Sequence, residues 1–172
     1  MQECGRNLIR ERTFLVHDYD RAVEHSKAKD SFNKTFGRAK DESDYYVIYS
    51  NPCVEYWFLL HTSYSDSDYH RSVCQEKVKN ICNKKREEAG LSRLHEDDYK
   101  SEPMLFEYIG GLEGVCIACR NAKTRFDRED KSGSAVGPFS TIHHASQRPC
   151  TNLFELLQAL DEFAERIHEK GK

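Results

Sequence analysis

Short apolar runs and longer amphipathic stretches alternate along this 172-residue chain. A compact apolar run covers residues 13–17, and a second run of aromatic and β-branched residues covers 45–49. Both runs are typical of buried β-strands. Between them, the segment from Arg21 to about Lys40 has a partly amphipathic helical pattern. Strand, helix and strand in this order predict a right-handed βαβ unit with parallel strands.

Helical patterns dominate the rest of the chain. Residues 52–61 are apolar and aromatic and follow the second strand directly, so that Asn51 is expected to cap a helix whose first position is Pro52. The helix expected over 152–167 has Thr151 or Asn152 as its N-cap. Its apolar positions lie on one face: Leu153, Leu156, Leu157, Leu160 and Phe163. Two further helices are expected over 69–89 and 104–128, the second with a break or a tight helix crossing at Gly110-Gly111.

The number of strands is low for an α/β protein. Two parallel strands do not form a stable sheet by themselves, because parallel sheets need several strands with both faces covered. Either a further strand lies in 1–11 or 139–143, or another chain completes the sheet, and we expect the second. By its length the chain is one domain. We expect a partial α/β core in residues 1–65 and a helical extension in 66–172 that packs on the same core.

Composition limits the partners of this protein. Hydrophobic residues make up 38% of the chain and charged residues 32%, and the net charge is −3. This balance gives no overall attraction for nucleic acid, so that such binding needs a local basic patch. The best patch is the basic flank of the helix over 69–89, although such a flank is more often simply solvated. It contains Lys77, Lys79, Lys84, Lys85 and Arg86.

No apolar run is long enough to span a bilayer, and the first residues lack the apolar core of a signal peptide. We therefore expect a cytoplasmic protein without a membrane partner. The seven cysteines are then expected to be reduced. Cys116 and Cys119 have CxxC spacing inside an expected helix, which leaves open a zinc or redox module with ligands from His143-His144 and Cys150.

Acidic residues follow both predicted strands. Asp18 and Asp20 come at the end of the first strand, two residues apart and on the same side of it. Two carboxylates so placed suit an oxygen-rich Mg²⁺ site, whereas a helix cap would explain only one of them. Glu55 stands in an otherwise apolar helix just past the second strand, where ligands bind in open α/β sheets. A simpler interpretation is that Glu55 and His61 favour the two ends of the helix dipole.

Taken together, these segments resemble the RloB-like family. The family carries a hydrophobic strand that ends in D-x-D, as in residues 14–20, and then an S-N-P-C-x-E-x-W-x-L-L-H segment, as in residues 50–61. Pro149–Leu153 is loosely similar to its C-terminal N-P-[ST]-T segment, and Tyr99-Lys100 to its mid-chain Y-x-K. The 50–61 segment is the most specific of these matches.

The resemblance implies a divergent TOPRIM-like fold with a parallel sheet, and a gene found beside restriction and abortive-infection loci that act against phage. It implies that Asp18 and Asp20 bind Mg²⁺ or Mn²⁺ and that Glu55 and His61 are site residues beside the metal. One departure is that the family's first motif, E-G-x-x-T-E, has no counterpart before Asp18. The chain is therefore expected to lack that N-terminal portion, unless Glu55 serves as a third metal ligand.

Three functions follow from these patterns, in order of preference. The first is a metal-dependent nuclease of phage defence, in which Glu55 or His61 transfers protons and Lys100 or Arg120 binds the phosphate. The second is a non-catalytic subunit whose sheet pairs with the missing half, an associated ATPase or another copy of the chain. The third is the zinc or redox module at Cys116 and Cys119.

Overall fold

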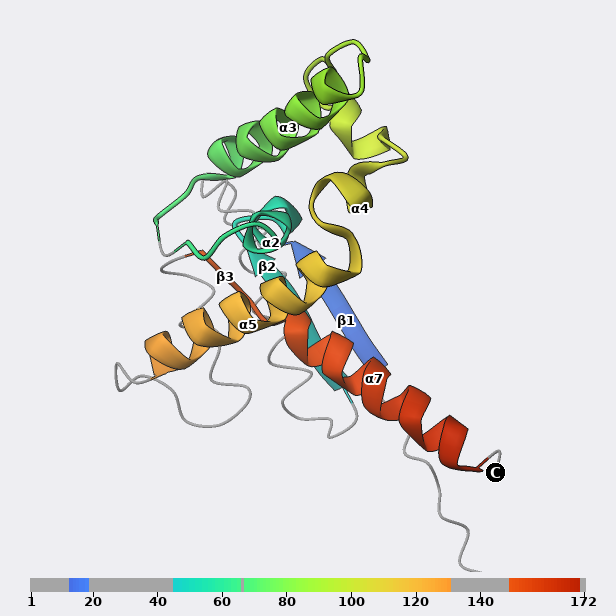
Figure 1. Ribbon diagram of the computed structural model, residues 1–172. Coiled ribbons are helices and arrows are strands. Elements are labelled where there is room, and N and C mark those ends of the chain that lie inside the picture. Colours follow the sequence, from blue (N-terminus) through green and yellow to red (C-terminus); the bar gives the residue numbers. More distant parts are fainter. Residues whose placement is uncertain (1–12, 19–44, 66, 131–148, 171–172) are drawn as a thin grey trace, which may run out of the picture.

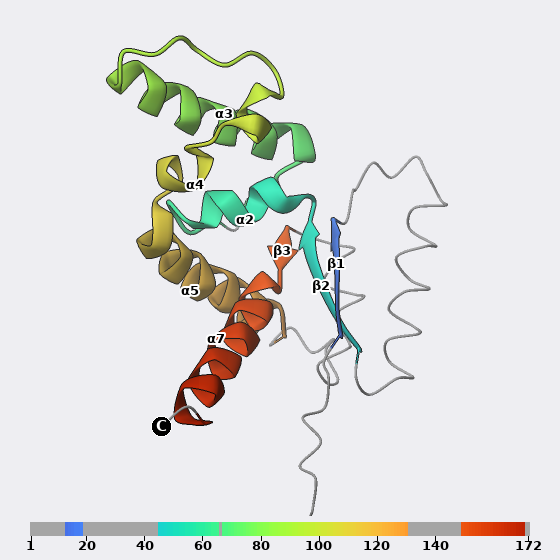
Figure 2. The same cartoon turned by 90° about the vertical axis from the view of Figure 1, so that its right-hand side faces the viewer.

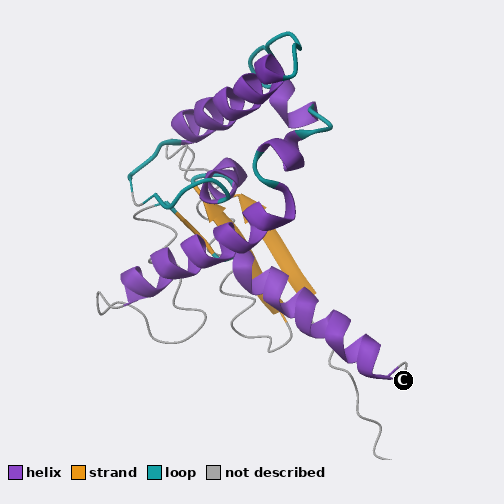
Figure 3. Cartoon of the chain, in the orientation of Figure 1, coloured by secondary structure: helices purple, strands orange, loops and turns teal. Residues whose placement is uncertain are grey.

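A computed structural model describes residues 13–18, 45–65, 67–130 and 149–170 of the chain (Figure 1). Short strands and longer helices alternate in this part, and helices make up most of its C-terminal half (Figure 3). In chain order the elements are β1 (Thr13–Asp18), β2 (Tyr45–Asn51), α2 (Val54–Leu60), α3 (Arg71–Glu88), the 3₁₀ turn η1 (Asp98–Ser101), α4 (Leu105–Tyr108), α5 (Gly111–Asp130), β3 (Cys150–Thr151) and α7 (Leu153–Lys170). The helix predicted over 21–40 lies outside the described residues.

The sheet of the described residues has three strands in the order β1-β2-β3. β1 and β2 are parallel, in a register that pairs Thr13 with Tyr45 and Asp18 with Ser50, which confirms the two predicted strands and their direction. β3 pairs with the end of β2 in the antiparallel sense. The protein is therefore an α/β protein with a small mixed sheet and a helix-rich C-terminal half.

The third strand corrects the sequence prediction, which had expected a partner chain to complete the sheet or a strand in 1–11 or 139–143. It comes from this chain, at residues 150–151. A strand of two residues has no alternation that a sequence pattern can reveal. It forms because the chain returns to the end of β2 just before α7 begins. Residues 1–11 and 139–143 lie outside the described residues.

The described helices lie on one side of the sheet (Figure 2). α2 and α7 pack against β2, α5 packs against α2, α7 and β3, and α3 packs on α2 from farther out. Trp57 and Leu60 of α2 are 6% and 0% exposed, as the sequence predicted for core residues. They share the core with Val78 of α3, Tyr99 of η1 and Phe154 of α7.

The predicted start of the first helix is wrong. Asn51 and Pro52 do not begin α2, because the antiparallel ladder pairs Asn51 with Cys150 and keeps it in β2. The Asn51–Pro52 peptide bond is cis. Cys53 follows in an extended conformation, with φ −162° and ψ 170°, and makes no side-chain cap hydrogen bond to α2, which begins at Val54. Strand pairing has taken the residue that the local pattern assigned to the cap.

The predicted break at Gly110-Gly111 is confirmed, because these residues separate α4 from α5 and have φ angles of +116° and +56°. Just beyond the break, α5 crosses α2 at close range. A Cβ on Gly114 would lie 2.9 Å from Nδ1 of His61 and 2.9 Å from the carbonyl oxygen of Ile109. The crossing therefore depends on a residue without a side chain at this position.

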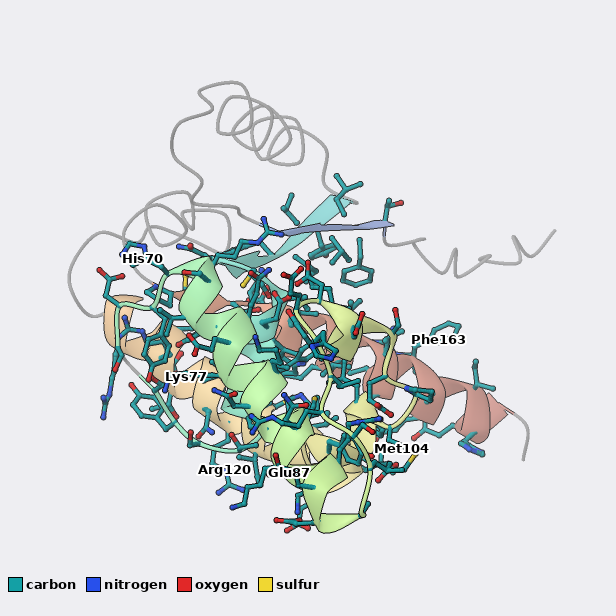
Figure 4. The ribbon with its side chains drawn as sticks, turned by 90° about the horizontal axis from the view of Figure 1, so that it is seen from above. His70, Lys77, Glu87, Met104, Arg120 and Phe163 are labelled. Atoms are coloured by element: carbon teal, nitrogen blue, oxygen red, sulfur yellow. The ribbon has the colours of Figure 1, made fainter. Side chains whose placement is uncertain are left out.

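The last predicted helix is confirmed as α7, and Oγ1 of Thr151 accepts a hydrogen bond from the N–H of Leu153 at 3.2 Å. Only the first part of its apolar face is covered. Phe154 is buried, whereas Leu160, Phe163 and Ile167 are 52%, 53% and 57% exposed (Figure 4). None of the described helices has the length and apolar composition that a membrane span requires.

Candidate functional site

The carboxyl ends of β1 and β2 meet at one edge of the sheet, since the two strands are parallel. Asp18 ends β1 opposite Ser50, and Glu55 lies in the first turn of α2 directly after β2. This is the edge at which open α/β sheets bind ligands. The side chain of Asp18 is outside the description and Asp20 lies beyond the described residues, so the geometry of the D-x-D pair stays a prediction.

Glu55 is the best-connected buried acid of this edge. It is 4% exposed, and its Oε1 accepts a hydrogen bond of 2.7 Å from the hydroxyl of Tyr99. The Nζ atom of Lys100 lies 3.9 Å from the same oxygen. The structure thus brings together two of the predicted site residues, Glu55 and Lys100, across 44 residues of sequence between α2 and η1.

The surroundings of Glu55 keep it ionised. Burial raises the pKa of this carboxyl, but hydrogen bonds from Tyr99 and Cys53 and the charge of Lys100 outweigh burial, and the net pKa is lowered. The pKa of Tyr99 is raised by burial and by its bond to Glu55, and that of Cys53 by its bond to Cys74, by burial and by Glu55. Tyr99 and Cys53 therefore act as donors to a fixed negative charge.

Lys100 connects this buried carboxylate to the surface. Its side chain is 41% exposed, and its Nζ atom also lies 3.3 Å from a carboxylate oxygen of Asp97. The same atom lies 5.7 Å from the centre of the Tyr99 ring. Lys100 can thus approach an anion from solvent while it stays near Glu55.

His61 lies in a different environment from Glu55. It is 3% exposed, it packs edge-on against Trp57 at 5.4 Å between ring centroids, and it contacts Gly114 of α5. Neither ring nitrogen has a hydrogen-bond partner among the described residues. Burial lowers the pKa of His61 to about 4, so the ring is neutral at physiological pH.

Asn152 is a buried residue whose part at this edge the sequence did not reveal. Its side chain accepts a 2.8 Å bond from the N–H of Tyr49 and donates a 2.9 Å bond to the carbonyl oxygen of Val47. Thr151 adds a 2.8 Å bond from its hydroxyl to the carbonyl oxygen of Tyr49 and lies 2.9 Å from the Ser50 hydroxyl. The loose similarity of residues 149–153 to the family segment was the available signal, but the local pattern indicated only a helix cap.

The predicted nucleic-acid residues differ in how free they are. Lys84 is exposed, Lys85 pairs with Glu88 at 3.0 Å, and Arg86 pairs with the nearly buried Glu102. Arg120 is exposed on α5 and lies at the periphery of the molecule (Figure 4). α3 and α5 both pack on α2, and Arg86 has a structural partner inside the protein. Lys84 and Arg120 are the more accessible cations.

Metal ligands were examined in the part of the chain that the structure describes. There, no three His, Cys, Asp or Glu side chains come close enough to hold a metal ion. Cys116 is exposed and Cys119 partly buried on α5, both as free thiols, and burial raises the pKa of Cys119. These two cysteines thus gain no third ligand from the described residues, and His143-His144 lie outside them.

A Mg²⁺ site at the sheet edge depends on Asp18 and Asp20. Two carboxylates are a suitable donor set for a hard divalent cation. Glu55, the alternative third ligand, already accepts the Tyr99 hydroxyl through Oε1. The described residues therefore do not complete the site by themselves.

Comparison with known proteins gave one match. The sequence model of the RloB-like protein family matches residues 5–160 of the chain. No curated protein and no solved structure matches it.

Proposed function

Because the chain belongs to the RloB-like protein family, we propose that it is a Mg²⁺- or Mn²⁺-dependent nuclease of a phage-defence system. The observation that supports this most is the parallel register of β1 and β2. It pairs Asp18 with Ser50, at the edge from which Glu55 and α2 continue. Carboxylates at such an edge suit a metal that acts on phosphodiesters.

Asp18 and Asp20 hold the metal in this proposal. A bound Mg²⁺ neutralises charge on a phosphate and lowers the pKa of its water. The remaining work falls to the residues of η1 and α2. Lys100 contacts a phosphate oxygen from the surface, and the ionised Glu55 is the better of the two acid–base candidates, because His61 is buried without a hydrogen-bond partner among the described residues.

The substrate is RNA or DNA, held by a local set of cations rather than by the net charge of −3. Lys84 and Arg120 are exposed and suit backbone contacts. Lys85 can join them by exchanging Glu88 for a phosphate. Arg86 contributes less to binding, since Glu102 already holds it.

The test is a nuclease assay on labelled RNA and DNA with Mg²⁺, with Mn²⁺ and with EDTA. We expect cleavage that needs the metal and that falls at least about 100-fold in a variant with both Asp18→Asn and Asp20→Asn. Asp161→Asn, at an exposed acid of α7, is the matched control and keeps full activity. Full activity of the double variant, or cleavage that persists in EDTA, would contradict the metal role.

A second candidate function is a non-catalytic subunit that pairs its sheet with another chain, namely the missing N-terminal half, an associated ATPase or a second copy. The observation that favours it is the place of β1 at the edge of the sheet, with Val16 60% exposed. Among the described residues, no strand pairs with the outer side of β1. An edge of this kind is a template for strand addition.

A further inference from the structure

Tyr99 is the buried tyrosine that joins the turn η1 to the helix α2. Its side chain is 1% exposed, and its hydroxyl donates the 2.7 Å hydrogen bond to Oε1 of Glu55. Burial raises the pKa of Tyr99, so the hydroxyl keeps its proton and its direction as a donor. The bond therefore fixes the position of η1 relative to α2.

Lys100 follows Tyr99 directly in η1, a turn of four residues. A short turn with a buried anchor leaves little freedom to the neighbouring backbone. The Lys100 side chain itself is long, and ordering it costs up to about 2 kcal/mol of rotamer entropy. Exposed ion pairs of lysine usually do not repay this cost.

Two carboxylates hold the ammonium of Lys100 in different ways. Oε1 of Glu55, 3.9 Å away, is the oxygen that also receives the Tyr99 hydroxyl. Asp97, 3.3 Å away, is 73% exposed and so holds Lys100 less firmly. Glu55 is thus the fixed point of this set, and Tyr99 is what orients it.

We propose that Tyr99 is a positioning residue that acts through Glu55 to hold Lys100 in the orientation that contacts a nucleic-acid phosphate. The phosphate contact rests on the proposed function. The positioning step does not, because it concerns only the contacts among these three residues. Tyr99 does not touch the substrate in this proposal.

Positioning is tested first without nucleic acid. The protein is labelled with an amine-reactive ester, and mass spectrometry compares the rate at Lys100 with the rate at Lys84 of the same molecule. In Tyr99→Phe the rate at Lys100 is expected to rise about threefold or more, since a released ammonium is more accessible. Tyr56→Phe is the matched control, because Tyr56 is also buried and its hydroxyl makes one bond of 2.9 Å, to the carbonyl oxygen of Ser65.

The phosphate contact is tested by the binding of a fluorescent single-stranded RNA in EDTA, where no metal-dependent cleavage occurs. Lys100→Gln is expected to weaken binding about tenfold, as for the loss of one charge-assisted hydrogen bond. Tyr99→Phe is expected to weaken it about threefold or more, and Lys100→Arg to restore most of the affinity. Tyr99→Phe with Lys100→Gln binds no more weakly than Lys100→Gln, because Tyr99 acts only through Lys100.

The outcomes separate this proposal from the nuclease. An unchanged labelling rate in Tyr99→Phe, an equal rise in Tyr56→Phe, or additive losses in the double variant would overturn positioning, whatever the nuclease assay gives. RNA binding that Lys100→Gln leaves unchanged would overturn the phosphate contact. A rise in labelling confined to Tyr99→Phe, together with non-additive binding losses, supports the proposal even in a protein that cleaves nothing.

Discussion

The two ionisable residues that interrupt the apolar helix α2 have opposite environments. Glu55 is buried with a donor at hydrogen-bond distance and a cation nearby. His61 is buried against Trp57 and Gly114 with no hydrogen-bond partner among the described residues. The sequence singled out both residues, but only the tertiary contacts separate an ionised carboxylate from a neutral imidazole.

The His61 environment predicts a pH dependence of stability. Burial lowers its pKa from 6.5 to about 4 in the folded protein, so protonation favours the unfolded chain. The stability from neutral His61 is fully present above pH 6.5 and is lost as pH falls toward 4. Between pH 7 and pH 5 the free energy of unfolding is expected to fall by about 2 kcal/mol.

Urea unfolding at the two pH values measures this change. His61→Phe keeps a planar ring without a titrating group, and it should remove most of the fall. His70→Phe, at an exposed histidine, is the control and should keep it. The interpretation fails if the His61 and His70 variants show the same pH dependence.

At the scale of elements, the join between β2 and α7 carries the polar core. Asn152 bonds both the N–H of Tyr49 and the carbonyl oxygen of Val47, and its amide nitrogen also donates to Oε2 of Glu155 at 3.1 Å. It thereby replaces a longer ladder between β2 and β3, since β3 has only two residues. One side chain thus satisfies backbone groups that would otherwise be buried without partners.

Asn152→Ala is therefore expected to destabilise the protein by about 2–4 kcal/mol, because it leaves a buried N–H and a buried carbonyl group without partners. Gln158→Ala, which removes an exposed amide from the same helix, is expected to change stability by less than about 0.5 kcal/mol. Urea or thermal unfolding of both variants measures the difference. Equal losses would mean that the Asn152 bonds contribute nothing beyond helix propensity.

At the scale of the whole molecule, the sheet is covered unevenly. In the described part of the chain the helices lie on one side of it, and β1 forms its outer edge (Figure 2). The sequence prediction that the sheet is incomplete is thus half corrected. The chain supplies β3 at one edge, whereas the other edge stays the place where a partner strand would add.

Pairing through β1 predicts a concentration-dependent mass if the partner is a second copy. Light scattering would show a mass above the 20.0 kDa of one chain, and Val16→Lys would return it to that value by placing a charge on the exposed edge. Leu160→Lys, at an exposed residue of α7, is the control for a general effect of charge. A chain that stays at 20.0 kDa and binds Mg²⁺ would argue against self-pairing and for the nuclease.

The sequence by itself determined the elements whose signal is local and the motif that carries the family. β1, β2, α3, the glycine break and α7 follow from runs and periods within a few residues. The singular acid in α2 could be found in the same way. These features needed no knowledge of distant contacts.

Only the tertiary structure decided the features that depend on pairing between distant residues. The antiparallel ladder with Cys150 keeps Asn51 in the strand and removes the predicted cap. Tyr99 and Lys100 join Glu55 from 44 residues away, and Asn152 reaches β2 from 103 residues away. The reason is physical, since a buried donor or acceptor is satisfied by whichever group the fold brings near, and the separation of the two groups along the chain has no part in it.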